Sequence, residues 1–276
     1  MNRNKVPARG HFGFSSGIRT EESIQGMYKV FRRRKTTFIL MLAAVTVLTS
    51  IAVIGIGGVH VPFVDVVRSL LHGTIPGLVG EPSQSYYPSV VFGYRLPRIL
   101  LAVVTGACLG VAGAAMQGIL RNPLADPFTL GLSSAASCGA AVGLVMGPSL
   151  LGSLYYMNFS LFGTTMTMSW VFMVLCAFGF GLLSTFILIL LTGRKPVSQS
   201  TLILTGVVIG YLFSAVMSYL KYATDEATLQ DITMWLLGGM WGASWSAIII
   251  VVPVAVIGIL ITESYAVDLN ALSSGD

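Results

Sequence analysis

The sequence predicts an all-α polytopic transmembrane helical bundle, on the basis of its composition and its recurring apolar runs. Of the 276 residues, 54% are hydrophobic and 10% are charged, whereas about a quarter of the residues of soluble domains are charged. Apolar runs close to the roughly 20 residues that cross hydrocarbon as a helix recur along the chain. Six spans are expected, at residues 37–57, 99–120, 129–147, 169–191, 201–220 and 245–262.

The basic residues predict how the chain is oriented in a plasma or inner membrane. Residues 1–36 form a basic tail with nine Lys and Arg before the transmembrane domain of 37–262. The first span has no signal-peptide cleavage site, so we expect a retained anchor with a cytoplasmic N-terminus. Alternation then places 58–95, 148–168 and 221–244 outside, with 12 of the 16 basic residues inside. The net charge of +5 therefore reflects topology, and no nucleic-acid partner is expected.

Small residues recur at every fourth position in the second, third and fifth spans. Because lipid supplies little hydrophobic force between helices, such stripes favour close backbone contact. Four residues advance a helix by about 400°, so each stripe drifts and faces more than one neighbour. The pattern therefore predicts a compact multi-helix bundle. The glycines expected at helix contacts are Gly106, Gly110, Gly131, Gly139, Gly143, Gly206 and Gly210.

Side chains for catalysis, metal binding or ion coupling do not converge anywhere in the sequence. The three cysteines and three histidines show neither a disulfide framework nor metal-ligand spacing. No ionisable residue lies in the middle of a span, which argues against an ion-coupled carrier. No GxxxxGK[ST] phosphate loop occurs, so any ATP hydrolysis is expected on a partner subunit. We therefore expect no enzyme activity on this chain, no catalytic residue, no metal and no cofactor.

Two connecting segments carry local predictions. The string "RNPLADP" (121–127) is expected to be a cytoplasmic turn, because Pro123 and Pro127 stop the flanking helices. Segment 60–72, "HVPFVDVVRSLLH", is expected to be an external amphipathic helix. Its expected apolar face consists of Val61, Val64, Val67, Leu70 and Leu71.

Three stretches resemble the permease subunits of ABC importers for iron–siderophores, haem and vitamin B12, the FecCD-type family. "RLPRILLAVVTGACLGVAGAAMQGILRNPLADPFTLGLSSAASCGAAVGL" (95–144) resembles the second and third helices of that family. "STLILTGVVIGYLFSAVMSYLKYATDEATLQDITMWLLGGMWGASW" (200–245) resembles its fifth helix, the short external helix after it and the start of the sixth. "DLNALSSGD" (268–276) resembles the start of its cytoplasmic coupling element. The family pattern continues to ten helices, so we expect a fragment, a truncated product or a remainder on another chain.

The resemblance implies roles for particular residues. Arg95 and Arg98 match the arginines that face acidic side chains of the external binding protein, although they could also be snorkelling anchors. The fifth helix lines the family's translocation path, with Ser214, Met217 and Ser218 as expected wall positions, for each of which core packing is an equal alternative. Segment 263–276 begins the coupling element, incompletely. Its expected ATPase contacts are Leu269, Asn270, Ala271, Leu272, Gly275 and Asp276.

The resemblance also implies partners and a mechanism. Expected partners are cytoplasmic ABC ATPase subunits, an extracytoplasmic substrate-binding protein, a second permease subunit and membrane lipid. The expected function is import of iron–siderophore complexes by alternating access, powered by the separate ATPase. A secondary transporter or channel is one alternative, and a non-transporting fragment with an assembly role is another. The sequence leaves open siderophore, haem or cobalamin as substrate, and a homodimer or a heterodimer as the assembly.

Overall fold

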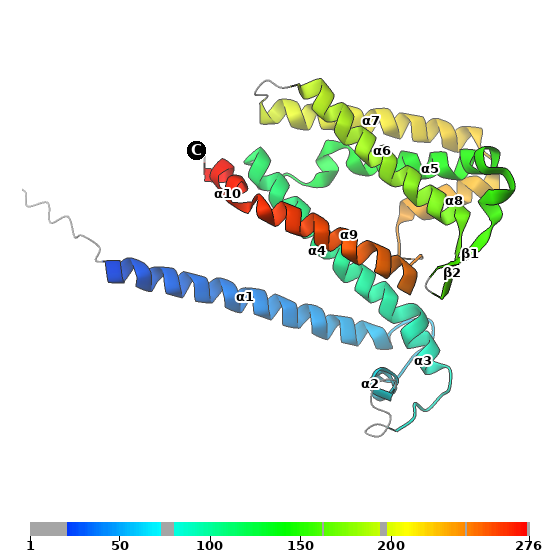
Figure 1. Ribbon diagram of the computed structural model, residues 1–276, viewed down its shortest axis with the longest axis horizontal. Helices are drawn as coiled ribbons and strands as arrows, with labels where there is room; N and C mark the ends of the chain where they lie inside the picture. The colour runs from blue at the N-terminus through cyan, green and yellow to red at the C-terminus, as the bar shows by residue number, and fades with distance from the viewer. Residues whose placement is uncertain (1–20, 73–79, 162, 194–197, 241, 275–276) are drawn as a thin grey trace, which may run out of the picture. The chain divides into compact units, whose positions relative to one another are not determined.

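The computed structural model describes residues 21–72, 80–161, 163–193, 198–240 and 242–274 (Figure 1). The chain divides into two compact units, residues 1–60 and 61–276, and each is described by itself. The first unit holds one long helix, α1 (Glu21–Gly55). Its helical residues begin within the expected basic tail, because no proline or glycine pair separates that part of the tail from the apolar run.

In its described residues, the second unit consists of helices, connecting turns and one two-stranded sheet. Its elements, in chain order, are α2 (Phe63–His72), α3 (Tyr87–Val90), a π turn (Val91–Arg95), α4 (Leu96–Leu120), a 3₁₀ turn (Pro127–Leu130), α5 (Leu132–Leu151), a 3₁₀ turn (Gly152–Tyr156), β1 (Asn158–Leu161), β2 (Thr164–Thr167), α6 (Met168–Thr192), α7 (Gln199–Ala223), α8 (Glu226–Leu237), α9 (Trp245–Ser264) and α10 (Ala266–Ser274).

The six expected spans are confirmed as six helices in the described residues that are long and apolar enough to cross a membrane. They are Tyr28–Gly55, Tyr87–Leu120, Leu132–Tyr156, Met168–Thr192, Gln199–Ala223 and Trp245–Ser264. Several boundaries differ from the prediction: the first span begins at Tyr28 rather than at residue 37, and the third ends at Tyr156 rather than at residue 147. The second span begins at Tyr87 rather than at residue 99, because the helix continues through the RLPR segment. The third begins at Leu132 rather than at residue 129, because Gly131 adopts a left-handed conformation with φ of 73°.

The sequence did not predict the β1–β2 hairpin in the segment expected to be an external loop. The two strands are antiparallel, with Asn158 opposite Thr167 and Leu161 opposite Thr164. The threonines of β2 favour a strand because they branch at Cβ, and Gly163 at the turn has φ of 79°. The Thr167 hydroxyl then caps α6 by accepting a hydrogen bond from the Trp170 N–H at 3.4 Å.

Helix α5 packs closely against α6 through two glycines. A Cβ added to Gly143 would lie 2.9 Å from the Cα of Met173, and one on Gly139 would collide with the Cys176 carbonyl. Hydrogens therefore take the place of side chains where the two backbones approach. Ala140, Met173 and Ala177 form a buried apolar cluster in the same contact.

Glycine also makes the contact between the start of α5 and α7. A Cβ on Gly131 would lie 2.7 Å from the Gly210 nitrogen, and one on Gly206 would lie 2.6 Å from the Cα of Leu130. Gly131 is therefore required both by its left-handed backbone and by the neighbouring helix. Five buried residues pack together nearby: Ala135, Cys138, Leu188, Ile209 and Phe213.

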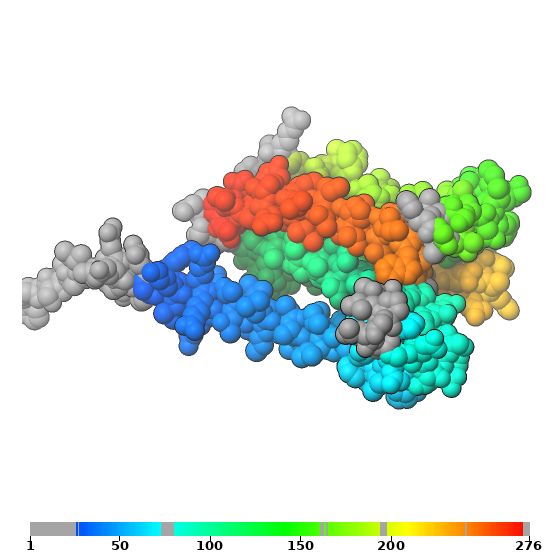
Figure 2. All heavy atoms as spheres, turned by 60° about the horizontal axis from the view of Figure 1, so that its bottom comes forward, coloured from blue at the N-terminus to red at the C-terminus, as the bar shows by residue number. Residues whose placement is uncertain are grey.

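Helix α4 packs differently from the prediction. It lies along α9 and meets α10 near its own C-terminus, as Figure 2 shows. A Cβ added to Gly106 or Gly110 would find no described atom within 4 Å. The contact with α10 falls instead at Gly118, where the added atom would lie 3.5 Å from the Leu269 carbonyl oxygen. Within the described part of the chain, Gly106 and Gly110 therefore make no close helix contact.

The close contact at Gly139 and the open space at Gly110 give a matched test of the glycine contacts. We expect Gly139→Ala to lower the thermal unfolding midpoint of the purified chain in detergent, because overpacking a close contact costs about 1–3 kcal/mol. Gly110→Ala is the control, since its methyl group meets open space and alanine favours the helix. Equal midpoints for the two variants would contradict the packing described here.

Candidate functional site

The two expected docking arginines lie on one helix, at a π turn that the sequence did not predict. Arg95 is half-buried at the end of this turn, and Arg98 is exposed on the first turn of α4. Pro97 has no N–H and its ring would clash with the carbonyl four residues earlier, so a regular α-helix cannot continue through it. The chain widens there, and the Leu96 N–H bonds to the Val91 carbonyl, five residues earlier. The helical segment that leads into α4 thus extends on the N-terminal side of both arginines, back to Tyr87.

A tryptophan from α9 holds this turn. The Trp245 Nε1–H donates a hydrogen bond of 2.9 Å to the Phe92 carbonyl, across 153 residues of sequence. In an α-helix the Leu96 N–H would donate to the Phe92 carbonyl. In the π turn it donates to the Val91 carbonyl instead, so the Phe92 carbonyl accepts from the Trp245 indole. Trp245 is also the first residue of α9, whose N-cap is the Ser244 hydroxyl, which accepts from the Ala247 N–H at 3.2 Å. The start of α9 therefore fixes the segment that carries the arginines.

Of the predicted apolar face, Val61 before α2 is buried, but α2 itself packs against α3 and the π turn with a different face. Its buried residues are Asp65, Val66 and Ser69, whereas Val64 is 58% exposed. The reason is the Asp65 carboxylate, whose Oδ1 accepts hydrogen bonds of 3.0 Å from both the backbone N–H and the hydroxyl of Ser83. Arg68 Nη1 lies 3.4 Å from the same oxygen. These contacts tie α2 to the segment that leads into α3.

The turn between α4 and α5 uses its own polar atoms to hold its shape. Arg121 ends α4 in a left-handed conformation with φ of 43°. The Asn122 Oδ1 accepts from the Leu124 N–H at 3.0 Å, and the Gln117 amide donates to the Pro123 carbonyl at 3.0 Å. The turn "RNPLADP" is thus confirmed as the end of one helix and the approach to the next.

The second half of this turn is a capped 3₁₀ turn. The Asp126 Oδ1 accepts from the Thr129 N–H at 2.8 Å, and the Thr129 hydroxyl donates to the Asp126 carbonyl at 2.7 Å. Leu130 then lies against Gly206 of α7. The turn is therefore fixed at both ends, by α4 and by α7.

The expected coupling segment forms α10, which packs on α4. Leu269 is half-buried at Gly118, and Asn270, Ala271 and Leu272 are exposed. Gly275 and Asp276 lie outside the described residues. Figure 1 shows α10 at the same end of its unit as the link from α4 to α5.

The comparison with known families identifies the family to which the chain belongs. Residues 41–276 match the FecCD transport family. The chain belongs to this family. The resemblance seen in the sequence is thereby confirmed, and the chain is a multi-pass membrane protein.

Individual relatives cover most of this FecCD-family chain. The uncharacterized ABC transporter permease protein YvrB of Bacillus subtilis is 34% identical over 257 residues, which are 91% of this chain and 68% of YvrB. The Fe(3+)-citrate import system permease protein YfmE of the same organism is 30% identical over 254 residues, 91% of this chain and 67% of YfmE. A solved ABC transporter described as metal-chelate type, in an inward-facing conformation, matches with a TM-score of 0.64 and 27% identity, over 86% of this chain and 65% of that chain. The chain spans about two thirds of the length of these proteins.

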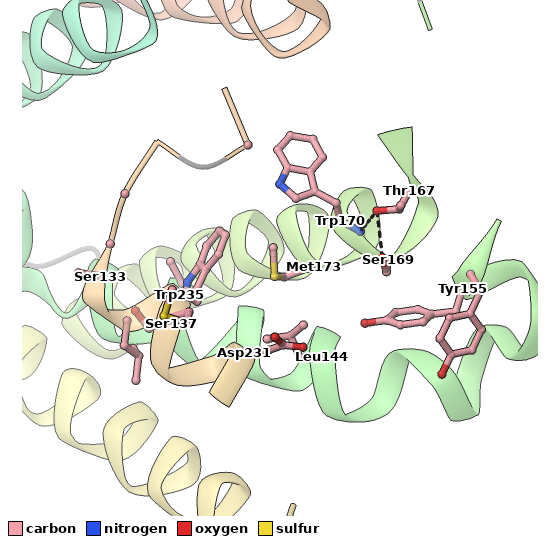
Figure 3. A pocket seen from close by; sticks show the side chains of 17 residues that line it. Ser133, Ser137, Leu144, Tyr155, Thr167, Ser169, Trp170, Met173, Asp231 and Trp235 are labelled. Carbon is pink, nitrogen blue, oxygen red and sulfur yellow. Dashed lines mark hydrogen bonds between the residues drawn. The ribbon is translucent and has the colours of Figure 1, made fainter. Parts of the chain in front are cut away.

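A cavity of about 970 Å³ opens between α5, α6 and α8 of this unit (Figure 3). Trp235, Gly238 and Gly239, which belong to the 200–245 stretch that resembles the family, line it together with Tyr155 and Trp170. Gly238 has φ of 75°, which lets the chain turn sharply after α8. Asp231 is the one carboxylate among the described lining residues. The walls are therefore mainly aromatic, aliphatic and hydroxyl side chains.

The three residues of α7 expected on the translocation path lie outside this cavity. Ser214, Met217 and Ser218 are not among the described residues that line the cavity. Met217 is half-buried against the cluster shared by α5 and α7, and the Ser218 hydroxyl donates to the Ser214 carbonyl at 2.9 Å within α7. Helix α5 contributes opposite faces to this cluster and to the cavity, since Ala135 and Cys138 face α7 while Ser133 and Ser137 line the cavity.

Sequence reasoning did not identify Trp245 or Asp65 as structural anchors. For Trp245 the partner is a backbone carbonyl, which no sequence pattern reveals. For Asp65 a signal was present, because a single carboxylate on a short apolar helix favours a local donor such as the serines of 80–90. Both anchors support the end of the bundle that carries Arg95 and Arg98.

The Asp65 contact predicts a pH-dependent contribution to stability. The Ser83 backbone N–H, followed by its hydroxyl and by Arg68, lowers the pKa of Asp65 below its ordinary value of 3.8, although burial opposes this. A lowered pKa in the folded state stabilises the fold above the unfolded value, and this stability is lost as the pH falls through the folded value.

We expect Asp65→Asn to unfold at a lower temperature than the wild-type chain at pH 7, and the difference to shrink as the pH falls below about 4. Thermal unfolding followed by circular dichroism in detergent measures this. Glu81→Gln is the control, since Glu81 is exposed in the segment between α2 and α3. A difference that stays constant from pH 7 to pH 2.5 would refute the role given to the Asp65 charge.

Proposed function

We propose that this chain is a membrane-spanning permease subunit of a binding-protein-dependent ABC importer for iron chelates. The observation that carries the proposal is the match to the FecCD transport family over residues 41–276. The geometry supports it at both ends of the second unit. At one end, Arg95 and Arg98 lie on a helical segment that is held by the hydrogen bond from Trp245. At the other end, α10 packs beside the end of α4.

The relatives and the cavity both support the proposed substrate class. Relatives named for the import of iron(3+)-hydroxamate, hemin, vitamin B12 and molybdate accompany the Fe(3+)-citrate permease. Iron chelates account for most of these names, and a volume of about 970 Å³ is at the upper end of cavities that hold drug-sized molecules. We propose an iron–siderophore complex as the substrate. Mainly uncharged walls suit a ligand that must be released as well as bound.

The mechanism proposed is alternating access driven by a separate ATPase subunit. The ATPase would act through Leu269, Asn270, Ala271 and Leu272 of α10, while the chain itself hydrolyses no ATP. A second permease subunit would complete the path, with Ser214, Met217 and Ser218 of α7 on its wall. The N-terminus would lie in the cytoplasm, which places Arg95 and Arg98 on the side of the external binding protein. Guanidinium groups suit that partner because they pair with carboxylates through two parallel hydrogen bonds.

The arginine pair gives a direct test of this function. In the complete transporter in nanodiscs, we expect Arg98→Glu to weaken the binding protein by about tenfold at low salt, mainly through a slower association rate, since reversing a charge at an interface rim changes association. Surface plasmon resonance measures both rates. Lys221→Glu is the matched control, because Lys221 is a basic residue in the last turn of α7, which the expected alternation of spans places on the same side of the membrane. Equal effects of the two reversals, or none, would contradict docking at the arginines.

A further inference from the structure

One face of α1 combines arginines with apolar side chains along a groove of about 420 Å³. Spacings of three and four residues bring side chains onto the same face of a helix. Arg33 and Arg34 lie toward one end of this face, and Phe38 and Met41, both more than half exposed, lie toward the other. The face therefore changes from cationic to apolar along the helix axis. The residues that line the groove are Val30, Arg33, Arg34, Thr37, Phe38 and Met41.

The length of α1 places this change at the edge of the hydrocarbon. The helix is continuous through the basic segment (Figure 1), and its candidate span, Tyr28–Gly55, has 28 residues. About 20 residues cross the hydrocarbon core, so about eight extend beyond it. The apolar run begins at Phe38, so the basic end is the part that extends. The two arginines thus lie at the level of the lipid headgroups, and Phe38 and Met41 lie at the level of the acyl chains.

No acidic residue lies close to these arginines in the sequence. Five of residues 29–35 are Lys or Arg, and no Asp or Glu occurs from residue 23 to residue 64. Lys35 is directed away from the groove, because its Nζ lies 4.8 Å from the centroid of the Phe31 ring. The two arginines are the cations among the described lining residues. Phosphate suits them, because it accepts two parallel hydrogen bonds from a guanidinium group.

We propose that this face of α1 binds one anionic phospholipid. The phosphate would accept hydrogen bonds from Arg33 and Arg34, and an acyl chain would lie along Phe38 and Met41. Headgroup and chain then meet their counterparts on the helix in the order that a bilayer imposes. The bound lipid would set the depth and the rotation of α1 in the membrane. This site requires only that α1 spans a membrane, so it is independent of the proposed import function.

A neighbouring helix is the competing occupant, and the side chains of the face favour lipid. Close helix contacts in the second unit are made through glycines such as Gly139 and Gly143. The described residues that line the groove on α1 include neither glycine nor alanine, so they do not let another backbone approach closely. A phospholipid also leaves the arginine heads at the interface, where long basic side chains are favoured.

Native mass spectrometry of the full chain tests the proposal. The chain is delipidated in detergent and titrated with palmitoyl-oleoyl phosphatidylglycerol or with the matching phosphatidylcholine, and the dissociation constant of the first bound lipid is measured. The test variant combines Arg33→Gln with Arg34→Gln. The matched control combines Arg32→Gln with Lys35→Gln, which removes the same charge from the side of the helix opposite the groove, as a rotation of about 100° per residue requires.

We expect phosphatidylglycerol to bind the wild-type chain about tenfold more tightly than phosphatidylcholine, and the test variant to lose about tenfold while the control changes by less than about twofold. The unfolding temperature of the delipidated chain should not change. Equal losses in the two variants would show diffuse attraction to the basic segment and overturn a site on this face. Unchanged binding with a lower unfolding temperature in the test variant would show that a helix covers the face, and would also overturn the proposal.

The apolar end of the groove gives an independent readout. We expect Phe38→Ala to weaken phosphatidylglycerol binding by about threefold, because the ring would be covered by an acyl chain. Ile39→Ala is the control, since Ile39 is 64% exposed at the same depth on the other side of the helix, and it should leave binding unchanged. Soluble glycerol phosphate in excess should leave the lipid bound. Displacement by glycerol phosphate, or equal effects of the two alanine variants, would contradict a site that holds the acyl chain.

Discussion

The close backbone contact of α5 with α6 and α7 is the constraint on which the second unit depends. Lipid tails are as apolar as the helix surfaces, so helices gain little by leaving lipid for one another. The attraction between the helices then comes mainly from van der Waals contacts, which become more numerous as the backbones approach. Gly139 and Gly143 permit that approach to α6, and Gly131 with Gly206 permits it to α7. The cavity, the α8 helix and the 3₁₀ turn of Pro127–Leu130 are all positioned relative to α5.

The ends of the bundle are held by a different kind of interaction. There, water is available and hydrogen bonds between side chains and backbone set the geometry. Trp245 holds the π turn, Asp65 accepts hydrogen bonds from Ser83, and Asp126 caps the 3₁₀ turn of Pro127–Leu130. In each case the polar group that fixes the structure is satisfied internally. Arg98 is among the residues left exposed at one end, and we assign it to the external binding protein.

The sequence predicted the features that follow from apolar length and from glycine spacing. Six spans and the turn at Pro123 and Pro127 could be predicted because hydrocarbon thickness and proline geometry act locally. The π turn could not, since it depends on the Phe92 carbonyl finding Trp245 far along the chain. The buried face of α2 was predicted wrongly for a similar reason. Hydrophobicity alone places Asp65 outward, whereas the Ser83 donors stabilise it inside.

The candidate site could be predicted only as separate residues. Arg95, Arg98 and Leu269 were identifiable from their resemblance to a family, but their supports were not. The glycine stripe showed the same limit, because Gly106 and Gly139 have equivalent spacing and only Gly139 meets a neighbouring backbone in the described chain. Spacing identifies a surface that permits close contact, and the fold determines whether a neighbour lies there.

Native mass spectrometry of the complex, extracted gently from host membranes through a tag on this subunit, tests the central claim most directly. The account predicts two permease subunits accompanied by two ATPase subunits, with the external binding protein joining when it is added. A complex in which the permease carries no ATPase subunit would contradict a coupled importer, and would favour a channel or an assembly role for this chain.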